Sequence, residues 1–179
     1  AYPPPEPIGP VDTLPFDQPL EMIFLSGAGA WCTGLDLNPD GTFTADYHDS
    51  DGSIQYVCQF HGKLGDFVQL TEHSWSLTLK ELVLDTKYPV GKEWDEGGFH
   101  KISSGPNGFT DQDGNALQPG ARFILYSPQA QGYAPGTELY GAYDFWTWWP
   151  GRHDWGPDDT LGCWGLYNLT QEIGFFSYD

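Results

Sequence analysis

The residue types best suited to ligand chemistry cluster between Asp144 and Gly156, in the stretch DFWTWWPGRHDWG. Indole faces stack on sugar rings, because the axial C–H groups of a sugar are apolar, and nearby carboxylate and guanidinium groups hydrogen-bond the sugar hydroxyls. The stretch is therefore a candidate glycan-binding platform. The side chains expected to form it are Trp148, Trp155, Asp144, Asp154, Arg152 and His153.

The same stretch also fits a structural role. Trp146 and Trp149 would then belong to the core, and residues 150–159 would form a surface loop anchored by Trp155. A tryptophan buries roughly 150 to 250 Å² and often holds a loop in place in a protein of this size. We expect the structural role for the cluster as a whole and ligand binding for Trp148, which points nearly opposite Leu139 if the segment is helical.

Two carboxylates of the stretch raise the alternative of a glycoside hydrolase. Such an enzyme needs a pair of carboxyl groups separated by roughly 5.5 Å for retention or 6.5 to 9.5 Å for inversion, and Asp144 with Asp154 is a conceivable pair. The chain has 25 acidic residues, however, so a carboxylate near a tryptophan is expected without catalysis. We therefore predict a binding domain with no catalytic residue. A third alternative is a protein-interaction module that uses the aromatic patch and has no small ligand.

Metal-binding motifs are weak in this chain. DLNPDGTF has the spacing of a calcium loop, but its twelfth position is Tyr47 where a bidentate Glu is needed, so we predict a hairpin turn. The acidic turns DYHDSDGS (46–53) and FTDQDGN (109–115) are better calcium candidates, although solvated turns fit them as well. We expect no cofactor, and calcium is the one ion that these turns leave open.

The charge of the chain excludes several partners. Seven Lys and Arg against 25 Asp and Glu give a formal net charge of -18, which repels nucleic acid and anionic membrane surfaces. No run of 18 apolar residues is present, so we expect no transmembrane segment. A glycan, or an apolar small molecule inside a barrel, remains as the expected ligand, and the oligomeric state is left open.

The three cysteines allow at most one disulfide. Cys58 alternates in phase with Tyr56 and Phe60, which predicts a buried thiol. Cys32 alternates out of phase with its apolar neighbours, so Cys32 with Cys163 is the expected pair if a bridge forms.

The elements that must position these residues read as one β-rich domain. Residues 1–19 hold seven of the fifteen prolines and fit a stiff spacer, as a tether to an envelope or as an ordinary terminus, and residues 20–179 fit a single domain. Short alternating strands begin at Leu20, with a break expected at His61–Gly62. One helix is expected near 137–149, capped by Thr137. The fold class is mostly β, an antiparallel meander forming a lipocalin-like barrel, with a β-sandwich as the alternative.

Two segments carry a resemblance. Residues 22–85 and the C-terminal segment resemble a group of secreted proteins and lipoproteins of anaerobic, largely gut-dwelling bacteria. The resemblance is carried by FLSGAGAWCTGLDLNPDGTFTADYHDSD, by VCQFHGKLGDFVQLTEHSWSLTLKELVLD and by the closing GLYNLTQEIGFF. The glycine-flanked Trp31 is similar to lipocalin-like barrels. This resemblance implies an extracellular or cell-surface location, lipid-anchored in some full-length forms, and a barrel architecture. It implies no catalytic residue.

Overall fold

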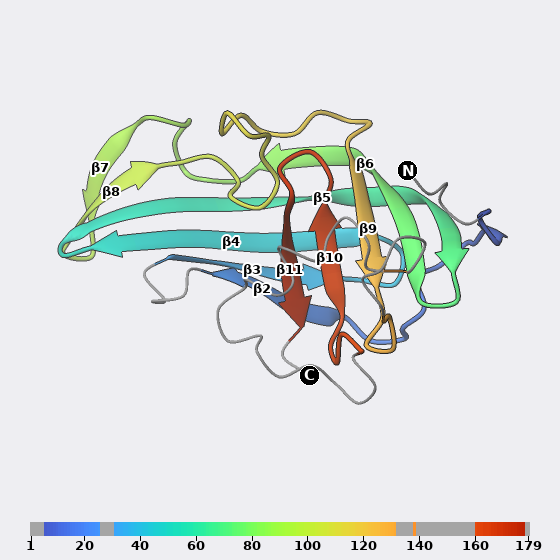
Figure 1. Ribbon diagram of the computed structural model, residues 1–179. Coiled ribbons are helices and arrows are strands. Elements are labelled where there is room, and N and C mark those ends of the chain that lie inside the picture. Colours follow the sequence, from blue (N-terminus) through green and yellow to red (C-terminus); the bar gives the residue numbers. More distant parts are fainter. Residues whose placement is uncertain (1–5, 26–30, 132–137, 139–159, 178–179) are drawn as a thin grey trace.

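The computed structural model describes residues 6–25, 31–131, 138 and 160–177, whose strands form one sheet (Figure 1). The first strands are β1 (Gly9–Pro10), β2 (Leu20–Leu25), β3 (Trp31–Leu37), β4 (Thr42–Asp51), β5 (Ile54–Thr71) and β6 (Ser74–Leu84). The others are β7 (Glu93–Glu96), β8 (Phe99–Ser103), β9 (Arg122–Tyr126), β10 (Gly165–Asn168) and β11 (Ile173–Ser177).

Eight of these strands close into an antiparallel barrel. Strands β2 to β6 each pair with the next, β6 pairs with β9, and β9, β10 and β11 follow in order. The pairing of β11 with β2 closes the ring. Closure removes the exposed edges that a meander of this length would otherwise carry. The predicted lipocalin-like barrel is confirmed, and the sandwich alternative is not what forms.

Aromatic rings fill the lumen of the barrel. Phe109 has no exposed surface, stacks on Phe43 with ring centroids 4.7 Å apart, and lies 4.8 Å from the ring of Phe123. Phe60 and Phe175 surround the same ring at 5.6 and 5.8 Å. Phe109 comes from the loop after β8, so this loop plugs a barrel whose strands supply the surrounding wall. An eight-stranded barrel is just wide enough for side chains to fill it in this way.

The expected break at His61–Gly62 is wrong. β5 runs without interruption through 18 residues. At Gly62 a Cβ atom would lie 2.0 Å from the carbonyl oxygen of Glu81 and 2.8 Å from the ring of Phe43. The glycine therefore permits the close approach of β6 and of a core ring, and it does not mark a turn.

A second apolar cluster covers the outer face of part of the barrel. Because side chains alternate along a strand, β9, β10 and β11 bury one set of residues in the lumen and the next set outside it. The buried outer members are Tyr126, Ala130, Leu161, Cys163, Tyr167 and Phe176, with Ile23, Leu25 and Ile124 packed against them.

Cys58 and Cys32 lie on the expected faces of their strands, but the expected disulfide is not formed. Cys58 is buried in the lumen, as predicted, and burial raises the pKa of its thiol to about 11. Cys32 lies on the outer face, opposite Leu25, and carries a free thiol. The bridge from Cys32 to Cys163 is therefore absent, although Cys163 packs in the same outer cluster as Leu25.

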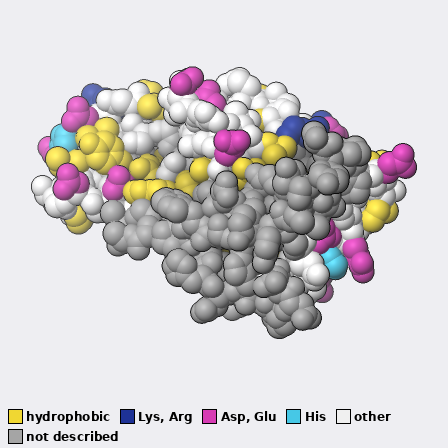
Figure 2. Space-filling model, viewed as in Figure 1, with side chains coloured by type: hydrophobic (Ala, Val, Ile, Leu, Met, Phe, Trp, Pro, Cys, Tyr) yellow, Lys and Arg dark blue, Asp and Glu magenta, His cyan; other side chains and the backbone are white. Residues whose placement is uncertain are grey.

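The long strands β4 and β5 extend past the barrel. Together with the β7–β8 hairpin, which pairs with β5, their ends form a region that we call the arm (Figure 1). The first residues of β5 pair with β8 in parallel, from Ile54 opposite His100 to Val57 opposite Ser103. Hydrophobic side chains gather at this end of the molecule (Figure 2). Tyr56 and Phe99, both on the arm, are 36% and 38% exposed.

The described part of the Pro-rich segment lies against the other end of the barrel. Gly9 and Pro10 pair with β5, and Val11 donates its backbone N–H to the carbonyl oxygen of Phe67. Leu14 is buried in the core. These residues thus contribute to folding, while the boundary drawn at Leu20 between spacer and domain stays a prediction.

The predicted helix at 137–149 falls outside the described residues except for Glu138, which lies in a turn. No helix is present in the described part of the chain, and so none there is long and apolar enough to cross a membrane.

Candidate functional site

The residues predicted to bind a glycan, Trp148, Trp155, Asp144, Asp154, Arg152 and His153, lie outside the described residues. Their role stays a prediction. Among the surface hollows in the described part of the chain, two that contain acidic side chains from the barrel strands are considered as ligand sites.

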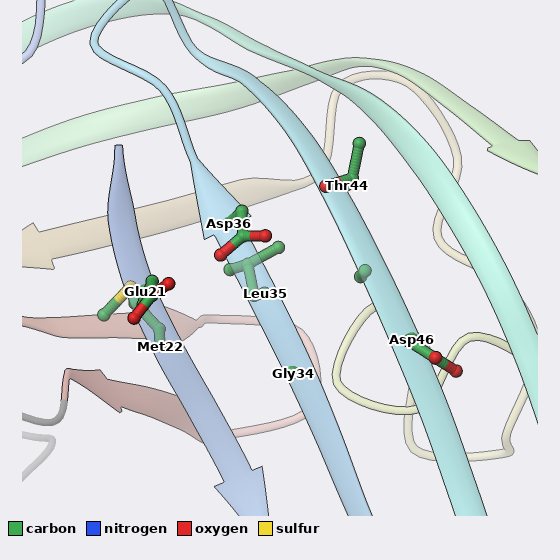
Figure 3. A pocket seen from close by; sticks show the side chains of 8 residues that line it. Glu21, Met22, Gly34, Leu35, Asp36, Thr44 and Asp46 are labelled. Atoms are coloured by element: carbon green, nitrogen blue, oxygen red, sulfur yellow. The ribbon is translucent and has the colours of Figure 1, made fainter. Parts of the chain in front are cut away.

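The first hollow lies on the outer face of β2, β3 and β4 and measures about 560 Å³. Figure 3 shows its acidic side chains, Glu21, Asp36 and Asp46, on these three neighbouring strands. Gly34 lies between them and has open space where a Cβ would be. Asp46 accepts a hydrogen bond from the side-chain amide of Gln59 over 3.2 Å. The hollow has no aromatic face, so it offers charge without a surface on which an organic ligand could pack.

The second hollow opens at the barrel mouth, next to the loop that carries Phe109, and measures about 530 Å³. It combines two aromatic side chains with carboxylate, amide and hydroxyl groups. The residues around it are Trp31, Tyr47, Asp49, Ser104, Gly105, Asn107, Thr110, Gln112, Asp113, Gly114 and Gln171.

Strand register places the aromatic and acidic groups of this hollow together. Trp31 of β3 lies directly opposite Asp49 of β4, and Thr33 lies opposite Tyr47. Directly opposite residues point to the same face of a sheet, with Cβ atoms roughly 4.5 to 5.5 Å apart. The inward-facing alternation of β4, which buries Phe43 and Ala45, therefore continues to Tyr47 and Asp49 at the mouth.

The two aromatic side chains of this hollow are partly buried, and Trp31 packs on a core ring. Trp31 makes a T-shaped contact with Phe24, with ring centroids 4.8 Å apart. Burial raises the pKa of Tyr47 to about 12, and the neighbouring Asp49 and Tyr56 add to the effect. The Tyr47 hydroxyl is therefore protonated near neutral pH and can donate a hydrogen bond to a ligand.

The opposite wall of the hollow is the loop after β8, which the barrel holds through side-chain hydrogen bonds. The hydroxyl of Thr33 donates to the carbonyl oxygen of Asn107 over 2.9 Å. Thr110 donates its hydroxyl to the side-chain oxygen of Gln171 over 2.8 Å, which leaves the amide N–H donors of Gln171 for a ligand. The wall is thus positioned before any ligand arrives.

Asn168 fixes the same loop from inside the fold. Its amide donates to the carbonyl oxygens of Gly108 and Thr110, and its side-chain oxygen accepts from the backbone N–H groups of Thr170 and Gln171. Asn168 has no exposed surface, so a single buried amide ties the plug loop to the β10–β11 hairpin.

The segments DLNPDGTF and FTDQDGN form turns in the structure, whereas residues 46–51 of DYHDSDGS belong to strand β4 and only Gly52 and Ser53 form a turn. Asp40 accepts hydrogen bonds from the backbone and hydroxyl of Thr42, which confirms the predicted hairpin at DLNPDGTF. Asp111 accepts from the backbone N–H groups of Asp113 and Asn115. No group of three or more His, Cys, Asp or Glu side chains in the described part of the chain is arranged to hold a metal ion. The calcium expectation remains untested.

Sequence reasoning missed this site although part of its signal was visible. Trp31 stood out for its glycine neighbours, Tyr47 was expected on the hairpin face of Leu35, Leu37 and Phe43, and Asp49 was assigned to the acidic turn 46–53. The alternation Phe43, Ala45, Tyr47, Asp49 could have identified them as one inward-facing row. Nothing local indicates that the loop residues Asn107 and Gln112 face the same hollow, because their placement depends on pairing over long sequence distances.

Comparisons of the chain with protein-family models, with curated proteins and with solved structures find no match. The function must therefore be inferred from the chemistry of the described surface.

Proposed function

We propose that this chain is an extracellular or cell-surface domain that binds a neutral glycan at the barrel mouth. The location follows from the resemblance of residues 22–85 to secreted proteins and lipoproteins. The observation that carries the binding function is the hollow that joins Trp31 and Tyr47 to Asp49 and to the polar loop opposite. Pockets that combine apolar faces with a few polar groups are the usual sites for small ligands.

The two kinds of group have separate tasks in this proposal. The indole of Trp31 provides a flat apolar face for the C–H groups of a sugar ring. The carboxylate of Asp49 accepts hydrogen bonds from sugar hydroxyls, and charge-assisted bonds of this kind are stronger than neutral ones. The amide N–H groups of Gln171 and the hydroxyl of Tyr47 donate to ring and hydroxyl oxygens.

The charge of the site selects the class of glycan. Asp49 and Asp113 both face the hollow, and the chain as a whole carries a formal charge of -18. Polysaccharides with carboxylate or sulfate groups would be repelled. A neutral sugar meets no such barrier.

The filled lumen weakens the alternative of an apolar ligand inside the barrel, because Phe109 occupies that space among four other rings. The hydrolase alternative depends on Asp144 and Asp154, which lie outside the described residues, and it stays a prediction.

A thermal-shift screen against neutral oligosaccharides, followed by calorimetry, tests the proposal. A ligand that binds only the native state must raise the melting temperature. We expect Trp31→Ala and Asp49→Asn each to weaken binding at least tenfold. The matched controls are Trp94→Ala on the arm and Asp36→Asn on the outer face of β3, which should leave affinity unchanged. The proposal fails if no neutral glycan binds, or if the controls weaken binding as much as the site variants.

A further inference from the structure

The row that joins Trp31 to Asp49 continues onto a third strand. Asp49 of β4 lies directly opposite Tyr56 of β5. Since Trp31 lies opposite Asp49 on the other side, all three side chains point to the same face of the sheet. The row therefore has an aromatic group at each end and a carboxylate in the middle.

Tyr56 is the most exposed aromatic side chain of this row's strand β5. Further along β5 the residues of the same face, Cys58 and Phe60, are buried in the lumen, whereas Tyr56 is 36% exposed. Its proximity to the mouth is supported by its electrostatic effect on Tyr47, whose pKa it helps to raise. A large exposed aromatic group beside a polar hollow is typical of a binding surface.

The spacing of the row sets the size of the ligand. Neighbouring strands lie roughly 4.8 Å apart, so Trp31 and Tyr56, two strands apart, are separated by about 10 Å at the backbone. A single sugar ring is too small to contact both aromatic groups. Two or more linked rings can span them, with Asp49 placed to bond hydroxyls near the linkage.

The sheet face that carries Tyr56 is wider than the three strands of the row. Tyr56 lies beside Ile102 of β8, and Ile54 lies beside His100, so the same sheet face continues along the arm. His100 bonds to Glu93 and Asp95, which makes this part of the face acidic as well. The arm thus extends the sheet face that begins at the barrel mouth, and its acidic groups favour the same uncharged ligands.

We infer that the site binds a linear neutral oligosaccharide, which lies across β3, β4 and β5 with one ring on Trp31 and another on Tyr56. This inference rests on the proposed glycan-binding function. It adds that the site takes at least two linked sugar rings, so that a monosaccharide occupies only part of it.

The test compares ligands of increasing length. Glucose, cellobiose and cellotetraose, with the matching mannose and xylose series, are titrated by calorimetry, and weak binding of the monosaccharides is measured by ligand-observed NMR. We expect at least one tetrasaccharide to bind ten times more tightly than its monosaccharide. Tyr56→Ala should remove this gain and leave monosaccharide binding unchanged. Tetragalacturonate, which has the same length but carries carboxylates, should not bind.

Phe99→Ala is the matched control, because Phe99 is equally exposed and lies on the opposite face of β8 from His100. It should bind every ligand as the parent chain does, and circular dichroism melts verify that both variants are folded. Equal affinity for monosaccharide and tetrasaccharide, or a Tyr56→Ala variant that keeps the gain, would overturn the inference while leaving glycan binding intact. Failure of every sugar to bind would overturn the proposed function and the inference with it.

Discussion

Asn168 donates a side-chain N–H to the carbonyl oxygen of Gly108 over 3.0 Å, at a position where Asn168 has no contact with solvent. This bond connects the end of β10 to the residue that precedes the ring at the centre of the lumen. The hollow at the barrel mouth and the core therefore share one structural support, which links the proposed binding site to the packing of the barrel.

Asn168→Asp should destabilise the fold and disturb the mouth. The substitution replaces two N–H donors by a carboxylate oxygen that faces the carbonyl oxygens of Gly108 and Thr110. An unsatisfied buried polar group costs about 1 to 3 kcal/mol, so we expect a loss of about 3 kcal/mol in the free energy of unfolding. Urea denaturation measures it. Asn115→Ala, an exposed change in the same loop, should cost under about 0.5 kcal/mol; equal losses would show that the buried amide has no special role.

Alanine substitutions at two glycines of the loop after β8 distinguish steric crowding from backbone strain. Gly108 and Gly114 both have positive φ, +98° and +86°, so alanine is strained at either position. Only at Gly108 would the new Cβ collide with a core ring, 2.3 Å from an atom of Phe175, whereas Gly114 has open space. We expect Gly114→Ala to cost about 1 to 2 kcal/mol and Gly108→Ala about 1 to 3 kcal/mol more. Thermal melts of the pair check the difference, and similar melting temperatures would contradict the observed packing.

His100 should titrate above its usual range. Its hydrogen bonds to Glu93 and then to Asp95 raise its pKa. A raised pKa means that the folded chain stabilises the protonated ring, so this contribution is complete below about pH 6.5 and is lost as the pH rises through the folded value. NMR titration of the His100 ring measures the shift. Glu93→Gln should lower the pKa of His100, and added salt should lower it as well because the ring is exposed. If neither change alters the pKa of His100, the pairing with Glu93 and Asp95 is excluded.

The strands that could be predicted are those whose alternation of apolar and polar residues matches their position in the barrel wall. Residues 20–25 and 31–37 form β2 and β3. In β3 the buried residues Thr33, Leu35 and Leu37 alternate with more exposed ones, which matches a wall with one face in the lumen. Gly62 was taken for a break because glycine commonly ends a strand, and only the packing of Phe43 and Glu81 shows why it lies inside one.

The site was less predictable than the barrel. β7 and its hairpin with β8 lack alternation strong enough to identify, and the parallel pairing of β8 with β5 joins segments that no hairpin connects. Phe109 lies in a turn-rich loop, where a core residue has no periodic signal. The tryptophans from 144 to 156 drew attention by their number, while Trp31 owes its position to a partner strand that composition does not reveal.

The join between β11 and β2 has consequences for how the protein is made. Among the described residues it is formed by two pairs, Phe176 with Ile23 and Ser177 with Met22, between segments about 150 positions apart in the chain. On the ribosome the early hairpins can assemble in order, but the ring stays open until residues 173–177 have emerged. Closure of the ring therefore depends on contacts of high sequence separation, and until these contacts form β2 presents an unpaired edge.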